Sequence, residues 1–93
     1  MLLAIDIGNT NITIGAYDSS FLVFTARLAT EQVKTSDQYA VELKNLLSLY
    51  NLESEEIEDC IISSVVPTVA KSISTAVSKL CHIVPLMLGP GVK

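Results

Sequence analysis

The first eighteen residues, MLLAIDIGNTNITIGAYD, constrain the fold of this chain more than any other stretch. Residues 1–7 are apolar except for Asp6, a pattern typical of a buried central strand that admits one carboxylate near its end. Residues 8–11, Gly-Asn-Thr-Asn, predict a tight turn, because Gly and Asn tolerate the backbone angles that a hairpin reversal needs. A second strand then begins, with Ile12, Ile14 and Ala16 on one face and Thr13, Gly15 and Tyr17 on the other. The stretch therefore predicts a β-hairpin with a polar turn.

Such a turn directs backbone N–H groups and hydroxyls outward, and a concavity of this kind suits anionic oxygens, above all phosphates. Asp6 lies at its floor and repels phosphate, so a role there requires a cation between them, for which a hydrated Mg²⁺ is suitable. The alternative is an ordinary hairpin, in which Asp6 only accepts hydrogen bonds from turn N–H groups. A carboxylate after five apolar residues argues against that alternative, because burying it unpaired is costly.

Three stretches resemble one known family. Residues 6–11, Asp-Ile-Gly-Asn-Thr-Asn, resemble the first phosphate motif of the actin/hexokinase/Hsp70-like kinase superfamily. Gly-Asn-Thr-Asn is most similar to type III pantothenate kinases, since sugar kinases of the superfamily usually show Gly-Gly-Thr there. Residues 63–67 (SSVVP) and 89–93 (GPGVK) resemble the same family, in the same order. The resemblance covers essentially all of this chain but about the first third of the family's length, so residues 1–93 are expected to be the N-terminal, phosphate-binding portion of a longer protein.

The resemblance implies a cytoplasmic enzyme that phosphorylates pantothenate with ATP to 4'-phosphopantothenate, the first step of coenzyme A biosynthesis. It implies a homodimer, and Mg²⁺ and a monovalent cation, K⁺ or NH₄⁺, as cofactors. Asp6 would orient the Mg²⁺ through water, and the ATP phosphates would lie against Asp6, Ile7, Gly8, Asn9, Thr10, Asn11, Ile12 and Thr13. The family's general base and its substrate-contacting residues belong downstream of Lys93, so the 93 residues alone are expected to be inactive.

Two other functions stay open on the sequence. One is a non-catalytic regulatory protein, similar to the transcription accessory factors of the same family, that keeps the phosphate hairpin without the chemistry. The other is a kinase of the same superfamily that acts on another small hydroxylated or carboxylated substrate. An aspartate in a downstream Gly-Ala-Asp-Arg-like motif would favour the kinase over the regulatory protein.

The remaining pattern predicts an α/β fold of the ribonuclease H-like class, in the order β-β-β-α-β-α-β, with a mixed five-stranded sheet. A helix is predicted to begin at Thr35 or Ser36 and to run to about Tyr50, because apolar residues recur there at helical spacing. The other predicted elements are strands over 21–29, 60–66 (buried on both faces) and 82–88, and a helix over 67–81 that begins with a proline.

Composition excludes several classes of protein. The chain is 49% hydrophobic, which is too apolar for disorder, and its net charge of −4 with six scattered basic residues makes nucleic acid an unsuitable partner. No apolar run is long enough to span a membrane, and the N-terminus lacks the basic residues of a secretion signal. Cys60 and Cys81 are not at metal-ligand spacing and are interpreted as buried free thiols of a reducing cytoplasm.

Four further side chains have open interpretations. Arg27 could reach the phosphate turn, although a solvated arginine at a sheet edge is the simpler interpretation. Ser63 and Ser64 place two hydroxyls at the end of a strand, where ligands collect in open α/β sheets, but such hydroxyls also cap turns. His82, the only histidine, is interpreted as a surface or strand-edge residue.

Overall fold

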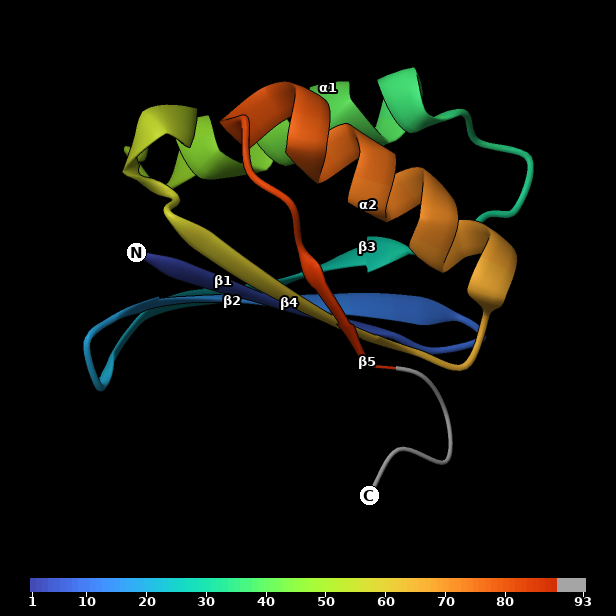
Figure 1. Cartoon of the computed structure of the whole chain (residues 1–93), viewed down its shortest axis with the longest axis horizontal. Helices are drawn as coiled ribbons and strands as arrows, with labels where there is room; N and C mark the ends of the chain where they lie inside the picture. Colours follow the sequence, from blue (N-terminus) through green and yellow to red (C-terminus); the bar gives the residue numbers. More distant parts are fainter. Residues whose placement is uncertain (89–93) are drawn as a thin grey trace.

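Three consecutive strands form an antiparallel meander in the computed structural model, which describes residues 1–88 (Figure 1). They are β1 (Leu2–Ile7), β2 (Asn11–Asp18) and β3 (Phe21–Ala29). Strands β4 (Asp59–Ser64) and β5 (Leu86–Leu88) each follow a helix, and β4 pairs parallel with β1 while β5 pairs parallel with β4. The sheet order is β3-β2-β1-β4-β5, so β1 is the central strand, as predicted.

Local sequence explains where the helices begin. α1 (Ser36–Leu49) starts after a capping box, in which the Thr35 hydroxyl accepts from the Gln38 N–H at 3.2 Å and the Gln38 side chain accepts from the Thr35 N–H at 2.8 Å. α2 (Pro67–Cys81) has its proline in the first turn, where no N–H is needed. A single 3₁₀ turn, η1 (Ser54–Glu56), precedes β4. No helix within residues 1–88 is both long enough and apolar enough to cross a lipid bilayer.

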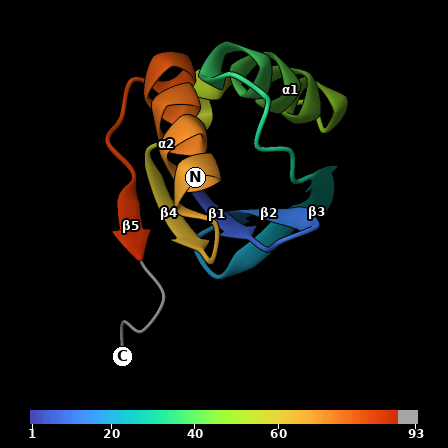
Figure 2. The ribbon, with the colours of Figure 1, turned by 90° about the vertical axis from the view of Figure 1, so that its right-hand side faces the viewer.

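Both helices lie on the same face of the sheet, and the core fills the space between the two layers (Figure 2). The sheet contributes an apolar side chain at every second position, as the period of a strand requires. The helices contribute residues at helical spacing. The core residues that are at most 2% exposed include Leu3, Ile5, Ile7, Ile12, Ile14, Ile62, Tyr39, Leu43, Ile73 and Val77. Each aliphatic side chain buried in this way contributes about 1.5–3 kcal/mol.

The prediction that the fourth strand is buried on both faces is wrong for the described residues, and β1, predicted as a buried central strand, is also buried on one face only. Ile5 and Ile7 lie under the helices, but Ala4 is only partly buried and Asp6 is exposed, because no described element covers the opposite face. β4 shows the same alternation. Strands buried on one face and on both faces have similar apolar sequences when the second face carries small residues such as Ala4.

The last strand is shorter than predicted. It begins at Leu86, and His82 does not open it but ends α2, with a left-handed backbone (φ 60°) and an N–H that bonds to the Ser78 carbonyl. Residues 83–85 then form the link to β5. The 89–93 stretch that resembles the kinase family lies outside the described residues.

Candidate functional site

The β1–β2 turn is closed by a hydrogen bond from the Gly8 N–H to the Asn11 carbonyl at 2.9 Å. None of residues 8–11 has a left-handed φ, so the predicted reason for Gly and Asn in this turn is wrong. Gly8 instead relieves crowding. A Cβ there would lie 3.2 Å from the Asn11 carbonyl oxygen, which is tighter than nine in ten such contacts, so a larger residue requires the turn backbone to shift by a few tenths of an ångström.

The turn directs its carbonyls into the protein. The Gly8 carbonyl accepts from the Thr30 hydroxyl at 2.9 Å, and the Thr10 carbonyl accepts from the Thr30 N–H at 3.0 Å. By contrast, within residues 1–88 the N–H groups of Asn9 and Thr10 have no hydrogen-bond partner, and both residues are exposed. Exposed N–H groups of successive residues can bind an anion.

The strand register brings four polar side chains into one row across the sheet. Asp6 pairs with Thr13 on one side and with Ser63 on the other, and Thr13 pairs in turn with Arg27. Residues directly opposite one another on neighbouring strands share a face, so all four belong to the face that the described helices leave uncovered. We call Arg27, Thr13, Asp6 and Ser63 the polar row. All four are exposed.

A hollow of about 270 Å³ lies on this face, and three members of the polar row, Asp6, Thr13 and Ser63, contribute to its wall. Its other lining residues include Ala4, with a single methyl group, and Gly15, with no side chain, so the space above the sheet stays open. The hollow is therefore a direct result of which residues occupy the second face of β1 and β2.

Asp6 is exposed, so the argument that an unpaired buried carboxylate must be functional does not apply. The alternative role is not observed either, because no described residue donates a hydrogen bond to Asp6. Within residues 1–88 no three His, Cys, Asp or Glu side chains gather to hold a metal. One carboxylate beside two hydroxyls nevertheless fits Mg²⁺, which binds through one or two carboxylates, waters and substrate phosphates.

Ser63 and Ser64 point to opposite faces. Ser64 lies beneath the helices, where its hydroxyl accepts from the Val66 N–H at 2.8 Å and donates to the Val66 carbonyl at 3.0 Å. It therefore caps the turn into α2. Of the two serines, Ser63 remains a candidate for ligand binding. Its position next to Asp6, and that of Arg27 next to Thr13, were not predicted from the sequence, although counting strand register outward from the turn leads to both.

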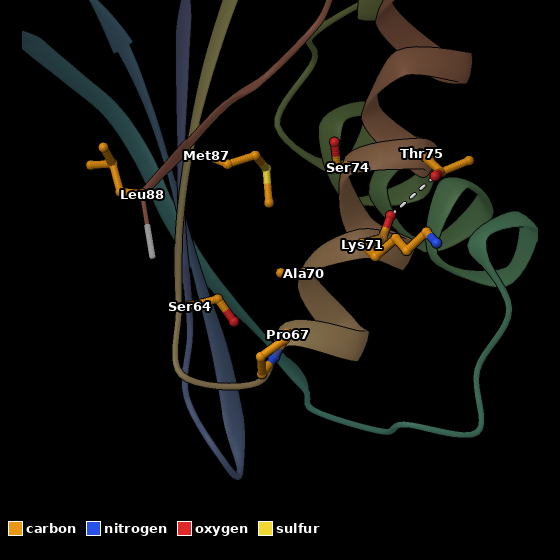
Figure 3. Close-up of a pocket in the computed structure, with 8 residues that line it drawn as sticks. All are labelled: Ser64, Pro67, Ala70, Lys71, Ser74, Thr75, Met87 and Leu88. Carbon is orange, nitrogen blue, oxygen red and sulfur yellow. Dashed lines mark hydrogen bonds between the residues drawn. The ribbon is translucent and has the colours of Figure 1, made fainter. Parts of the chain in front are cut away.

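A second hollow, of about 370 Å³, lies between α2 and β5 (Figure 3). Met87 points into it toward the helix, whereas Leu88 points to the other side of the sheet. Ser64 and Thr75 line it, but their hydroxyls are already bonded within the chain. The hollow does not include the β1–β2 turn, and its other polar lining residues are Lys71 and Ser74.

Both cysteines are free and buried. Burial raises the pKa of the Cys60 thiol from its ordinary 9.0 to about 12, and the nearby Cys81 adds to the shift. Burial also raises the pKa of Cys81. Both thiols are thus held in the unreactive, protonated form.

Comparison with known proteins identifies the family and the fold. A family model described as type III pantothenate kinase matches residues 2–93. A type III pantothenate kinase of Halalkalibacterium halodurans is 41% identical over all 93 residues, and the chain spans 37% of that relative's length. Among solved structures, a ROK hexokinase from Thermus thermophilus superimposes with a TM-score of 0.68 at 11% identity, covering 95% of this chain and 34% of that one. RuvC of T. thermophilus in complex with a Holliday junction gives 0.62 at 12% identity, covering 96% of this chain and 64% of that one. These two likenesses support the fold alone.

Proposed function

Because the chain belongs to the type III pantothenate kinase family, we propose that the full-length gene product containing these residues transfers the γ-phosphoryl group of ATP to the primary hydroxyl of pantothenate. The product, 4'-phosphopantothenate, begins the route to coenzyme A. The observation that carries the proposal is the position of Asp6, in register with two hydroxyls and next to a turn with two free N–H groups, in a chain of this family.

The turn and the polar row have different roles in this proposal. The N–H groups of Asn9 and Thr10 bind phosphate oxygens, while the hydroxyls of Thr13 and Ser63 bind phosphate or the waters of the cation. Asp6 would hold the Mg²⁺ through water, and the ion would supply charge neutralisation of the triphosphate. Phosphoryl transfer needs mainly positioning and charge neutralisation, so these groups suit the task.

The proposed phosphate site comprises residues 6–13, but its members contribute through different atoms. Ile7 and Ile12 are fully buried beneath the helices, so they offer only backbone groups, and the Ile7 carbonyl is already bonded to the Val65 N–H at 3.1 Å. Asn11 donates a long hydrogen bond to the Thr10 hydroxyl at 3.4 Å, which leaves both side chains able to turn toward a ligand.

In the reaction, the bond between the γ-phosphorus and its bridging oxygen to ADP breaks, and a new bond forms to the pantothenate oxygen. The hydroxyl proton passes to a base that we assign to chain beyond residue 93. We therefore expect the 93-residue chain alone to show no kinase activity. The monovalent cation, the homodimer and the cytoplasmic location belong to the same proposal and rest on family membership.

The test is Asp6→Asn in the full-length gene product, with Asp18→Asn at the far end of β2 as a matched control. Under saturating ATP and Mg²⁺, Asp6→Asn should lower kcat roughly 10²-fold or more, with an unchanged melting temperature, because it removes a charge without removing packing. Asp18→Asn should keep wild-type turnover. Wild-type turnover by Asp6→Asn would refute the role of Asp6.

An activity assay of the wild-type protein tests whether pantothenate is the substrate. ATP-dependent phosphorylation of pantothenate supports the proposal. Phosphorylation of a different hydroxyl compound identifies another kinase of the superfamily, and ATP binding without any phosphorylation identifies a regulatory protein; either result overturns the proposal.

A further inference from the structure

The segment that joins β3 to α1 runs beside the phosphate turn and is bonded to it at one residue. Thr30 follows β3 directly, and it donates from its partly buried hydroxyl to the Gly8 carbonyl (2.9 Å) and from its N–H to the Thr10 carbonyl (3.0 Å). Its two donors therefore hold two of the carbonyls of a turn whose own closing bond is the one from Gly8 to Asn11.

The hydrogen bond from the Thr30 hydroxyl fixes the orientation of the whole Gly8–Asn9 peptide, not only of its carbonyl. The Gly8 carbonyl and the Asn9 N–H belong to one planar trans peptide, so they point in opposite directions. A bond that draws the Gly8 carbonyl toward Thr30 therefore turns the Asn9 N–H away from the protein. If that peptide rotated, its carbonyl oxygen would face the phosphate oxygens in place of the N–H and would repel them.

The segment that carries Thr30 is itself locked onto α1. The Tyr39 side chain is fully buried, and its hydroxyl donates to the Glu31 carbonyl at 2.8 Å and accepts from the Glu31 N–H at 3.0 Å. Lys34 forms an ion pair with Glu42 at 2.6 Å and lies 5.4 Å from the Tyr39 ring centre. The hydrogen bond to Glu42 raises the pKa of Lys34, which keeps the pair charged. Thr30 thus stands on a rigid support.

We propose that Thr30 is a positioning residue for nucleotide phosphate, which acts by fixing the orientation of the Gly8–Asn9 peptide. This inference rests on the proposed function, since it assumes that the turn binds the phosphates of ATP. Thr30 need not touch the nucleotide. Its effect is to orient the Asn9 N–H toward the phosphate before the nucleotide binds, so that binding does not have to reorient the turn.

The test compares Thr30→Val, Thr30→Ser and Thr75→Val in the full-length gene product. Valine keeps the shape of threonine and removes the hydroxyl, whereas serine keeps the hydroxyl. Thr75→Val is the matched control, because it removes a hydroxyl that donates to the Lys71 carbonyl at 3.0 Å on α2, away from the turn. The readouts are the Kd for MgATP by calorimetry, KM and kcat, the melting temperature, and the amide resonance of Asn9.

We expect Thr30→Val to raise the Kd and KM for ATP about tenfold, the effect of one hydrogen bond, while kcat changes less than KM. The Asn9 amide resonance should shift in the protein without nucleotide. Thr30→Ser should return the Kd to within about twofold of wild type, and Thr75→Val should change nothing. Should Thr30→Val not fold, Thr30→Ala is expected to give the same rise in Kd.

An unchanged Kd and KM in Thr30→Val would overturn the inference, even if the melting temperature falls, because Thr30 would then have a structural role only. A serine variant as weak as the valine variant would also overturn it. If wild type binds MgATP in a Thr30-dependent way but does not phosphorylate pantothenate, the proposed function fails and the positioning role stands. If wild type binds no MgATP, both fail.

Discussion

The two faces of the sheet differ in composition, burial and proposed role, although they are made by the same strands. Ile5 lies 2% exposed beneath the helices, and its chain neighbour Asp6 is exposed on the opposite face. Ile14 is fully buried, and its neighbour Thr13 lines the hollow beside Asp6. The covered face holds the fold together through apolar packing, while the open face carries polar groups that packing does not need. Substitutions on the open face can therefore change ligand binding without disturbing the apolar packing that stabilises the covered face.

The largest expected effect comes from placing one carboxylate on each face in turn. Ile5→Asp puts an unpaired charge in the core and should cost more than about 4 kcal/mol, enough to unfold most domains. Ala4→Asp puts the same charge on the open face and should cost less than about 1 kcal/mol. Urea denaturation followed by circular dichroism would measure both. Equal losses would show that the open face is buried in the full-length protein.

The adjacent serines give a smaller contrast. Ser64→Ala leaves the buried N–H of Val66 without a partner, while the Val66 carbonyl keeps its bond from the Ala70 N–H, and should cost about 1–3 kcal/mol of unfolding free energy. Ser63→Ala should leave the unfolding free energy within about 0.5 kcal/mol of wild type, and should weaken ATP binding instead. Paired thermal melts and nucleotide titrations test this, and the same stability loss in both variants would break the contrast.

The smallest expected effect is the pH dependence of the unfolding free energy that comes from Cys60 on the covered face. The folded-state pKa of Cys60 is raised to about 12 from 9.0, so above pH 9 the unfolded chain releases a proton that the folded chain keeps. The contribution of Cys60 to the free energy of unfolding is therefore present below pH 9 and is lost as the pH rises toward 12, by roughly 1 kcal/mol between pH 9 and 10. Urea midpoints at pH 8, 9 and 10 measure the loss, and Cys60→Ala should reduce it, leaving the part that the buried Cys81 contributes. An equal slope in Cys60→Ala would assign the pH dependence to other groups.

Much of the fold was predictable because its signals are local. The alternation from Ile12 to Tyr17 indicated both faces of β2, and the capping residue Thr35 and the first-turn proline Pro67 indicated where the helices begin. One-sided burial of β1 was not predictable, because it depends on where helices far along the chain pack. The left-handed His82 was missed because a lone His at the end of an apolar helix also fits the start of a strand.

The candidate site divides in the same way. The turn and Asp6 could be proposed from contiguous residues, but the position of Ser63 beside Asp6 depends on register between β1 and β4, which are distant in sequence. Thr30 could not be found from its own surroundings in the sequence, a polar connection with weak preferences. Its proposed role depends on a hydrogen bond to the Gly8 carbonyl, which forms only once the chain has folded.

The central position of β1 has a consequence for synthesis of the protein. As the chain leaves the ribosome, β1, β2 and β3 can pair at once, because their partners are close in sequence. The other edge of β1 must wait until Asp59 and the residues after it emerge, since Leu2 pairs with Asp59. The nascent chain therefore displays the middle strand of its future sheet as an unpaired edge, which is a template for chaperone binding or for misassociation with a neighbouring chain.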